Sequence, residues 1–146
     1  MTPDGQILYF ASNRPGGLGG VDLWRAQRDG NGWTSPENLP DPINSTADEK
    51  QAVISPDGLW IYFASDRNGG MTEIFRVGVN PDGTFGSEAE TVLTGYTGEP
   101  SFTQDGRLFF VHVEIHFDQG TWELIDSDIY CVEPVGHSLP CTQPRI

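Results

Sequence analysis

The sequence is poor in basic residues and in cysteine, and it contains no long apolar run. Eight lysines and arginines stand against 21 acidic residues, which leaves a net charge of −13 over 146 residues. Nucleic acids and anionic membrane surfaces both attract basic surfaces, so neither is expected as a partner. No apolar run approaches the roughly 20 residues of a membrane-spanning helix. The two cysteines, Cys131 and Cys141, are too few for a disulfide framework, and they either form one bridge or stay as free thiols.

Helical periodicity and local catalytic motifs are also missing. The chain contains no Gly-x-Ser-x-Gly, no phosphate-binding loop and no His-Glu-x-x-His, and no cysteine is obviously paired with a histidine. These absences favour a protein that is not an enzyme, although a site assembled from several repeats would leave no local motif. Met1 is followed directly by a turn motif, without the basic and apolar segments of a signal peptide.

Turn residues and a repeated segment are abundant. Eighteen glycines and eleven prolines, spread along the chain, indicate many short strands. Residues 55–70 read SPDGLWIYFASDRNGG, residues 2–17 read TPDGQILYFASNRPGG, and a weaker copy begins at residue 104. The aspartate–glycine pairs of the three copies lie 53 and then 48 residues apart. A period near 50 residues is typical of propellers and solenoids, in which each unit buries its apolar face against the next.

Each unit reads as a series of short strands joined by tight turns, and the turn aspartates are expected to accept hydrogen bonds from turn amides. Four antiparallel strands per unit at this period make the blade of a β-propeller, whereas a sandwich or an open β-array does not explain the recurring module. We therefore predict an all-β fold, a β-propeller of about three four-stranded blades, with units at 1–48, 49–98 and 99–146 of a single domain. The expected strands are 6–12, 21–26 and 33–39; 51–55, 60–65, 73–79 and 85–93; and 100–103, 108–117 and 128–132.

One string in these units resembles a known family. Ser-Pro-Asp-Gly-x-x-Ile-Tyr-Phe-Ala-Ser-Asp-Arg-x-Gly-Gly, followed by an acidic, an aliphatic and an aromatic residue, is similar to the WD-like repeat of TolB-type periplasmic propeller proteins. The resemblance covers nearly all of residues 1–133, and the same type of repeat also occurs in propellers attached to prolyl-oligopeptidase-like peptidases. It implies a periplasmic or envelope-associated protein. A cytoplasmic location stays open because no signal peptide is visible.

The number of repeats departs from the family pattern. Propellers of this family usually have about six or seven blades, whereas three units are visible here and the first lacks an innermost strand. Open sheet edges favour association. Two copies could therefore close a six-bladed ring around a two-fold axis, as a homodimer in which the tail of one copy supplies the missing inner strand of the other.

Two arginines, Arg14 and Arg67, occupy the same position in the first two units. Each precedes an acid, Asp22 or Glu73, that begins the next strand. The predicted role of each arginine is an ion pair within the blade or hydrogen bonds to loop carbonyls. Ligand binding is the alternative.

Two acids, Glu49 and Glu99, stand where innermost strands begin, and Asp48 adds to them. In a propeller these strands line the axial channel. The pattern predicts an acidic funnel that could hold a cation or a basic peptide, and an acidic loop rim is the alternative.

Four polar residues alternate along the second strand of the third unit: His112, Glu114, His116 and Asp118. Alternate residues share one face of a strand, so the two histidines and Asp118 make a candidate site for zinc or another divalent metal. The two histidines are separated by roughly 13 Å on a regular strand, which is too far for one ion unless the strand bulges. The alternative is a solvated polar face.

These features favour a non-catalytic module that binds a protein or peptide, or a scaffold, with no cofactor other than a possible divalent metal. The alternative function is part of a propeller enzyme, either the gating propeller of a peptidase or a metal-dependent lyase or hydrolase acting on carbohydrates. A degenerate fragment with no independent role is a third interpretation.

Overall fold

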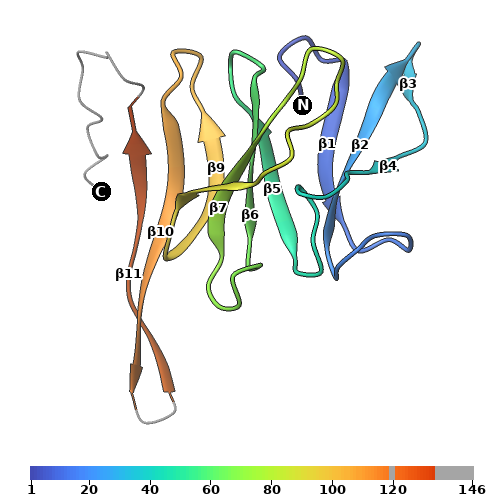
Figure 1. Ribbon diagram of the computed structural model, residues 1–146. Helices are drawn as coiled ribbons and strands as arrows, with labels where there is room; N and C mark the ends of the chain where they lie inside the picture. The colour runs from blue at the N-terminus through green and yellow to red at the C-terminus, as the bar shows by residue number, and fades with distance from the viewer. Residues whose placement is uncertain (119–120, 134–146) are drawn as a thin grey trace.

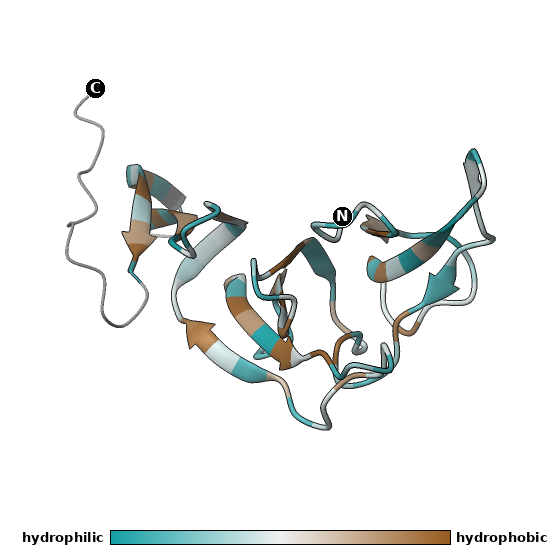
Figure 2. Ribbon diagram, turned by 90° about the horizontal axis from the view of Figure 1, so that it is seen from above, coloured by the Kyte–Doolittle hydropathy of each residue, from teal (hydrophilic) through white to brown (hydrophobic). Residues whose placement is uncertain are grey.

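All the regular structure in the described part of the chain is antiparallel β-sheet. The structure is a computed structural model that describes residues 1–118 and 121–133, and for 117, 118 and 122 it describes the backbone only. Three sheets stand side by side (Figure 1) and follow one another along an arc when seen from above (Figure 2). The predicted all-β, partial-propeller architecture is confirmed. Among the described residues there is no helix of the length and apolarity needed to cross a membrane.

The first sheet is built on the pair β1 (Ile7–Ser12) and β2 (Asp22–Asp29). Two short strands, β3 (Gly32–Trp33) and β4 (Glu37–Asn38), both pair with β2. They take the place of the single strand expected over 33–39. Pro36 lies in the break between them, and proline has no amide with which to continue a ladder.

The second sheet has the order β5 (Glu49–Ile54), β6 (Trp60–Ser65), β7 (Glu73–Gly78) and β8 (Glu90–Leu93). Strand β8 is shorter than the expected 85–93. Phe85 makes only an isolated bridge to Val79, and the amide of Gly86 bonds the carbonyl of Gly78, so this segment closes a turn before β8 begins.

The third sheet has the order β9 (Tyr96–Phe102), β10 (Leu108–Asp118) and β11 (Thr121–Val132). Strand β11 begins seven residues before the expected strand 128–132, because residues 121–127 continue the pairing with β10. The resulting β10–β11 hairpin projects beyond the other sheets (Figure 1). The predicted tail strand and Cys141 lie outside the described residues.

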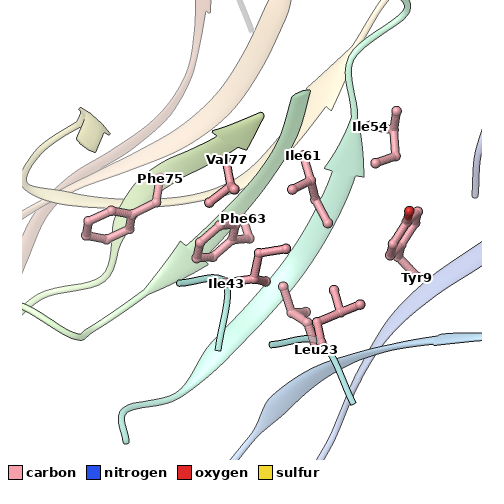
Figure 3. Packing of buried hydrophobic residues seen from close by; sticks show 9 residues of the cluster. Tyr9, Leu23, Ile43, Ile54, Ile61, Phe63, Phe75 and Val77 are labelled. Carbon is pink, nitrogen blue, oxygen red and sulfur yellow. The ribbon is translucent and has the colours of Figure 1, made fainter. Parts of the chain in front are cut away.

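The apolar core lies between neighbouring sheets. One cluster joins the first and second sheets, and Figure 3 shows its side chains meeting between β1, β5, β6 and β7. Phe63 and Leu23 are fully buried there, and burying a side chain of this size contributes about 1.5–3 kcal/mol. A second cluster joins the second and third sheets through Tyr62, Ile74, Leu108 and Phe110. Each sheet thus needs its neighbour, as the repeat predicts.

The aspartate–glycine turns form as predicted. Asp57 accepts hydrogen bonds from the amide of Leu59 at 3.0 Å and from the hydroxyl of Ser55 at 2.5 Å. Gly58 has a φ of 74°, a left-handed conformation that glycine adopts without strain. Asp4 makes the same contacts with Gln6 and Thr2 in the first sheet. The first two units therefore share the same turn, which precedes β1 in the first sheet and joins β5 to β6 in the second.

Candidate functional site

The innermost strands β5 and β9 share an unusual irregularity. Gln51 in β5 and Glu99 in β9 have φ values of 56° and 55°, which place both in the left-handed region. The pairing register shifts by one residue at the same place in each strand. Positive φ is rare for residues other than glycine, and such conformations cluster at functional sites. These two bulges are the first indication of a site.

The two bulges are in direct contact. The side-chain oxygen of Gln51 accepts a hydrogen bond of 2.8 Å from the backbone amide of Glu99. Beside it, a Cβ added to Gly98 would stand only 3.0 Å from the same oxygen, so this position favours glycine. The Gln51 side chain therefore spans the gap between the second and third sheets.

A pocket of about 240 Å³ opens at this junction. Its polar lining includes Gln51, Glu99 and Thr97, and its apolar lining includes Val111 and Val113 of β10. Thr97 is only 3% exposed, and its hydroxyl has no hydrogen-bond partner among the described protein groups. A buried hydroxyl without a partner costs about 1–3 kcal/mol. Ligand pockets typically combine apolar walls with a few such polar groups.

The charges at the rim of this pocket are mixed. Lys50 lines the pocket and pairs with Asp48 at 2.9 Å. The hydrogen bond between them raises the pKa of Lys50 and lowers the pKa of Asp48, so this pair is ionised at neutral pH. Glu99 is exposed, and its carboxylate has no partner among the described residues. Among the acids of the predicted funnel, Glu99 is therefore the one that lines the pocket without a paired cation among the described residues.

Glu49 is fully buried, at 0% exposed, and does not face an open channel. Its carboxylate accepts hydrogen bonds from the hydroxyl of Ser65 at 2.9 Å and from Arg67 at 3.2 Å. We call Glu49, Ser65 and Arg67 the Glu49 clasp. Ser45 donates both its amide and its hydroxyl to the same carboxylate. A ligand could reach Glu49 only by displacing these bonds.

Arg67 makes the predicted hydrogen bonds to loop carbonyls. It donates to the carbonyls of Pro42, at 2.7 Å, and Ile43, both in the connector between the first two sheets. Its acidic partner is Glu49 rather than the expected Glu73, which accepts a hydrogen bond from Asn68 instead. Arg14 adopts a similar pose in the first sheet, but no carboxylate contacts it among the described residues.

The predicted metal-binding residues lie along β10. His112 faces Thr97 on one side and Asp128 on the other, with its ring against Tyr130, and His116 faces Glu123. Within the described side chains, no three His, Cys, Asp or Glu residues lie close enough to hold an ion. The side chain of Asp118 falls outside this set. The metal site therefore stays a prediction.

Sequence reasoning missed Gln51 and Thr97. The signal for Gln51 was present, because it lies 48 residues before Glu99, the same interval that separates Asp57 from Asp105. Thr97 could not be found in this way, because its importance comes from burial and from its place opposite His112.

Comparison with solved structures shows a TolB-like fold. The chain is similar to a protein assigned as TolB from Agrobacterium tumefaciens, with a TM-score of 0.56 and 22% sequence identity over 87% of this chain. The match covers 47% of that protein, so the chain spans about half of its length. No family model matches the sequence, and no curated protein matches it.

Proposed function

We propose that this chain is a non-catalytic propeller module that binds a polypeptide segment in the pocket between β5 and β9. The observation that carries the proposal is the buried Thr97 hydroxyl, which lies beside two left-handed residues and lacks a protein partner. A bound polypeptide would supply the missing hydrogen-bond partner from its main chain. The alternative of an enzyme part has no comparable support from the described residues.

The charge of the site favours a segment with a basic side chain. Glu99 has no counter-charge in the described structure, and the chain as a whole carries a net charge of −13. An acidic protein attracts basic ligands and accelerates their association, and this attraction weakens with salt. The apolar walls at Val111 and Val113 would hold the stem of such a side chain.

Peptide selection tests this proposal. Random peptides displayed on phage are selected on the immobilised chain, and the affinity of a selected peptide is measured by fluorescence anisotropy. The selected peptides should be basic. Glu99→Gln should weaken their binding about tenfold, which corresponds to about 1.4 kcal/mol. Thr97→Val should also weaken binding, while the free protein becomes no less stable because an unpartnered buried hydroxyl is removed.

Glu88→Gln is the matched control, because Glu88 is exposed and does not line the pocket. It changes the net charge by the same amount as Glu99→Gln and should leave binding unchanged. The proposal fails if selected peptides bind the Glu99 and Thr97 variants as tightly as the unchanged protein.

We further propose that two copies associate to complete a six-bladed ring, and that the protein acts in the periplasm or cell envelope, as the family resemblance implies. Strand β11 supports association, because its outer edge pairs with no described strand and it exposes Leu124, Ile125 and Ile129. Unpaired apolar edges are sites of assembly. Sedimentation analysis should show a dimer, and a monomer at every concentration would contradict this part of the proposal.

A further inference from the structure

A second cavity lies beside the pocket between β5 and β9. It has a volume of about 490 Å³ and is lined by Gly70, Met71, Tyr96, Val113 and Ile115. We call it the Met71 cavity. Tyr96 and Val113 also line the pocket between β5 and β9, so the two hollows share one wall. Because they share this wall, one short ligand can reach both.

The Met71 cavity follows from the unequal lengths of β9 and β10. The pairing of these two strands ends where Tyr96 lies opposite Val113. Strand β10 continues through residues 114–118, which pair with β11 and have no partner on the β9 side among the described strands. In the second sheet, by contrast, β6 ends opposite the first residue of β5. The extension of β10 beyond β9 therefore leaves the hollow beside Ile115, and the turn between β6 and β7 forms its other wall.

The Met71 cavity is apolar, whereas the pocket beside it combines polar and apolar groups. The hydroxyl of Tyr96 is the one polar side-chain group among the described residues that line the cavity. Met71 is 38% exposed and Tyr96 is 43% exposed. Covering such apolar surface is favourable, and an unbranched methionine adapts to side chains of different shapes. The cavity therefore fits an aliphatic or aromatic side chain rather than a charged one.

The spacing of the two hollows matches that of an extended polypeptide. Val111 and Val113 line the pocket between β5 and β9, and Val113 and Ile115 line the Met71 cavity. The second pair is displaced from the first by two residues, which is about 7 Å along a strand. Side chains at positions i and i+2 of an extended ligand share one face and have the same separation. A segment lying along β10 therefore places alternate side chains in the two hollows.

We propose that the Met71 cavity is a second subsite for the polypeptide that binds in the pocket between β5 and β9. It holds a large apolar side chain two residues away from the basic one. This inference rests on the proposed function and adds a sequence pattern to it: a basic residue, any residue and a large apolar residue, in either chain direction. The basic residue is selected by the charge of Glu99, and the apolar residue is selected by burial against Met71 and Ile115.

Peptides selected on the immobilised chain provide the probe. They should carry an aliphatic or aromatic residue two positions from the basic residue. Each is resynthesised with alanine at the apolar position, and its affinity is measured by fluorescence anisotropy. Alanine should weaken binding about tenfold, as expected for the loss of a buried aliphatic side chain. Ile115→Ser should cause the same loss with the parent peptide and little further loss with the alanine peptide, because one contact is removed in both cases.

A cavity-filling variant separates binding from folding. A Cβ added to Gly70 meets no atom within 4 Å, so Gly70→Leu occupies the cavity without a clash. It should weaken binding of the parent peptide about tenfold, as the loss of the same buried side chain does, and leave the urea midpoint unchanged. Ile129→Ser is the control for Ile115→Ser, because Ile129 is an exposed isoleucine of β11 that lines neither hollow. It should leave binding unchanged.

Methyl NMR provides a second measurement. The signals of Met71 and Ile115 should shift with the parent peptide but not with the alanine peptide, whereas the signals of Val111 should shift with both. Full affinity of the parent peptide for Ile115→Ser and Gly70→Leu would overturn this inference.

The outcomes separate the second subsite from the proposed function. Peptides that lose affinity on Glu99→Gln and Thr97→Val, but not on Ile115→Ser, would leave the proposed function standing and remove the second subsite. Failure to select any peptide would overturn both.

Discussion

Replacing Arg67 by methionine should destabilise the protein far more than the same change at Arg14. Methionine retains most of the apolar stem that packs on the neighbouring rings, so the change chiefly removes the guanidinium group. At Arg67 this leaves Glu49 as a buried carboxylate without its cationic partner and also removes two hydrogen bonds to loop carbonyls. Breaking a buried ion pair from one side costs about 3–5 kcal/mol. Because the side chain of Arg67 is 15% exposed, we expect the lower end, about 3 kcal/mol.

At Arg14 the loss is smaller because no carboxylate is left behind. The change removes a cation–π contact with Phe10 and Trp24, worth about 0.5–1 kcal/mol, and a hydrogen bond to Ser12. Urea unfolding followed by tryptophan fluorescence measures both variants. With a slope of about 2 kcal/mol per M, the midpoint should fall by about 1.5 M for Arg67→Met and about 0.5 M for Arg14→Met. Equal losses would refute the argument that Glu49 distinguishes the two arginines.

Two further predictions concern turns and loops. Hydrogen bonds from Ser55 and then from the amide of Leu59 hold the pKa of Asp57 below its ordinary 3.8. The stabilisation by this carboxylate is therefore present above pH 3.8 and lost as the pH falls through the folded-state pKa. Asp57→Asn should reduce the loss of urea midpoint between pH 5 and pH 2, and an unchanged profile would contradict this. Gly19→Ala should lower the melting temperature by several degrees, because the new Cβ would lie 1.9 Å from the carbonyl oxygen of Ala47. Gly70→Ala has open space around its Cβ and should show no such loss.

The repeat made most of the architecture predictable from the sequence. The three aspartate–glycine pairs marked one turn in each unit, and the break at Pro36, although it was not predicted, follows from a residue type that the sequence shows. Both features depend on local chemistry. A tight turn of this kind needs a residue that adopts a positive φ, and a strand ladder needs a backbone amide that can donate a hydrogen bond. The first half of strand β11, before residue 128, escaped prediction because it is exposed and is ordered by pairing with β10.

The partner of Arg67 could not be predicted in the same way. Glu73 lies six residues away in the sequence and was the natural choice. The register that Ile54 and Ile61 set, continued without interruption, would place Glu49 opposite Asp66, where two acids would repel each other. The bulge at Gln51 shifts the pairing by one residue and places Glu49 opposite Ser65 instead. Neither glutamine nor glutamate has a strong preference for the left-handed region, so the bulge leaves no local signal.

The same shift occurs in the third sheet and relates the Glu49 clasp to the pocket between β5 and β9. There the bulge at Glu99 places Thr97 opposite His112, the position that Glu49 and Ser65 occupy in the second sheet. A short threonine in place of a buried glutamate makes no ion pair, and its hydroxyl stays without a protein partner beside an open pocket. The bulge therefore has two outcomes, a closed clasp in the second sheet and a pocket in the third. Because the backbone geometry is shared, the residue at the Glu49 position decides whether each site stabilises the fold or stays available to a ligand.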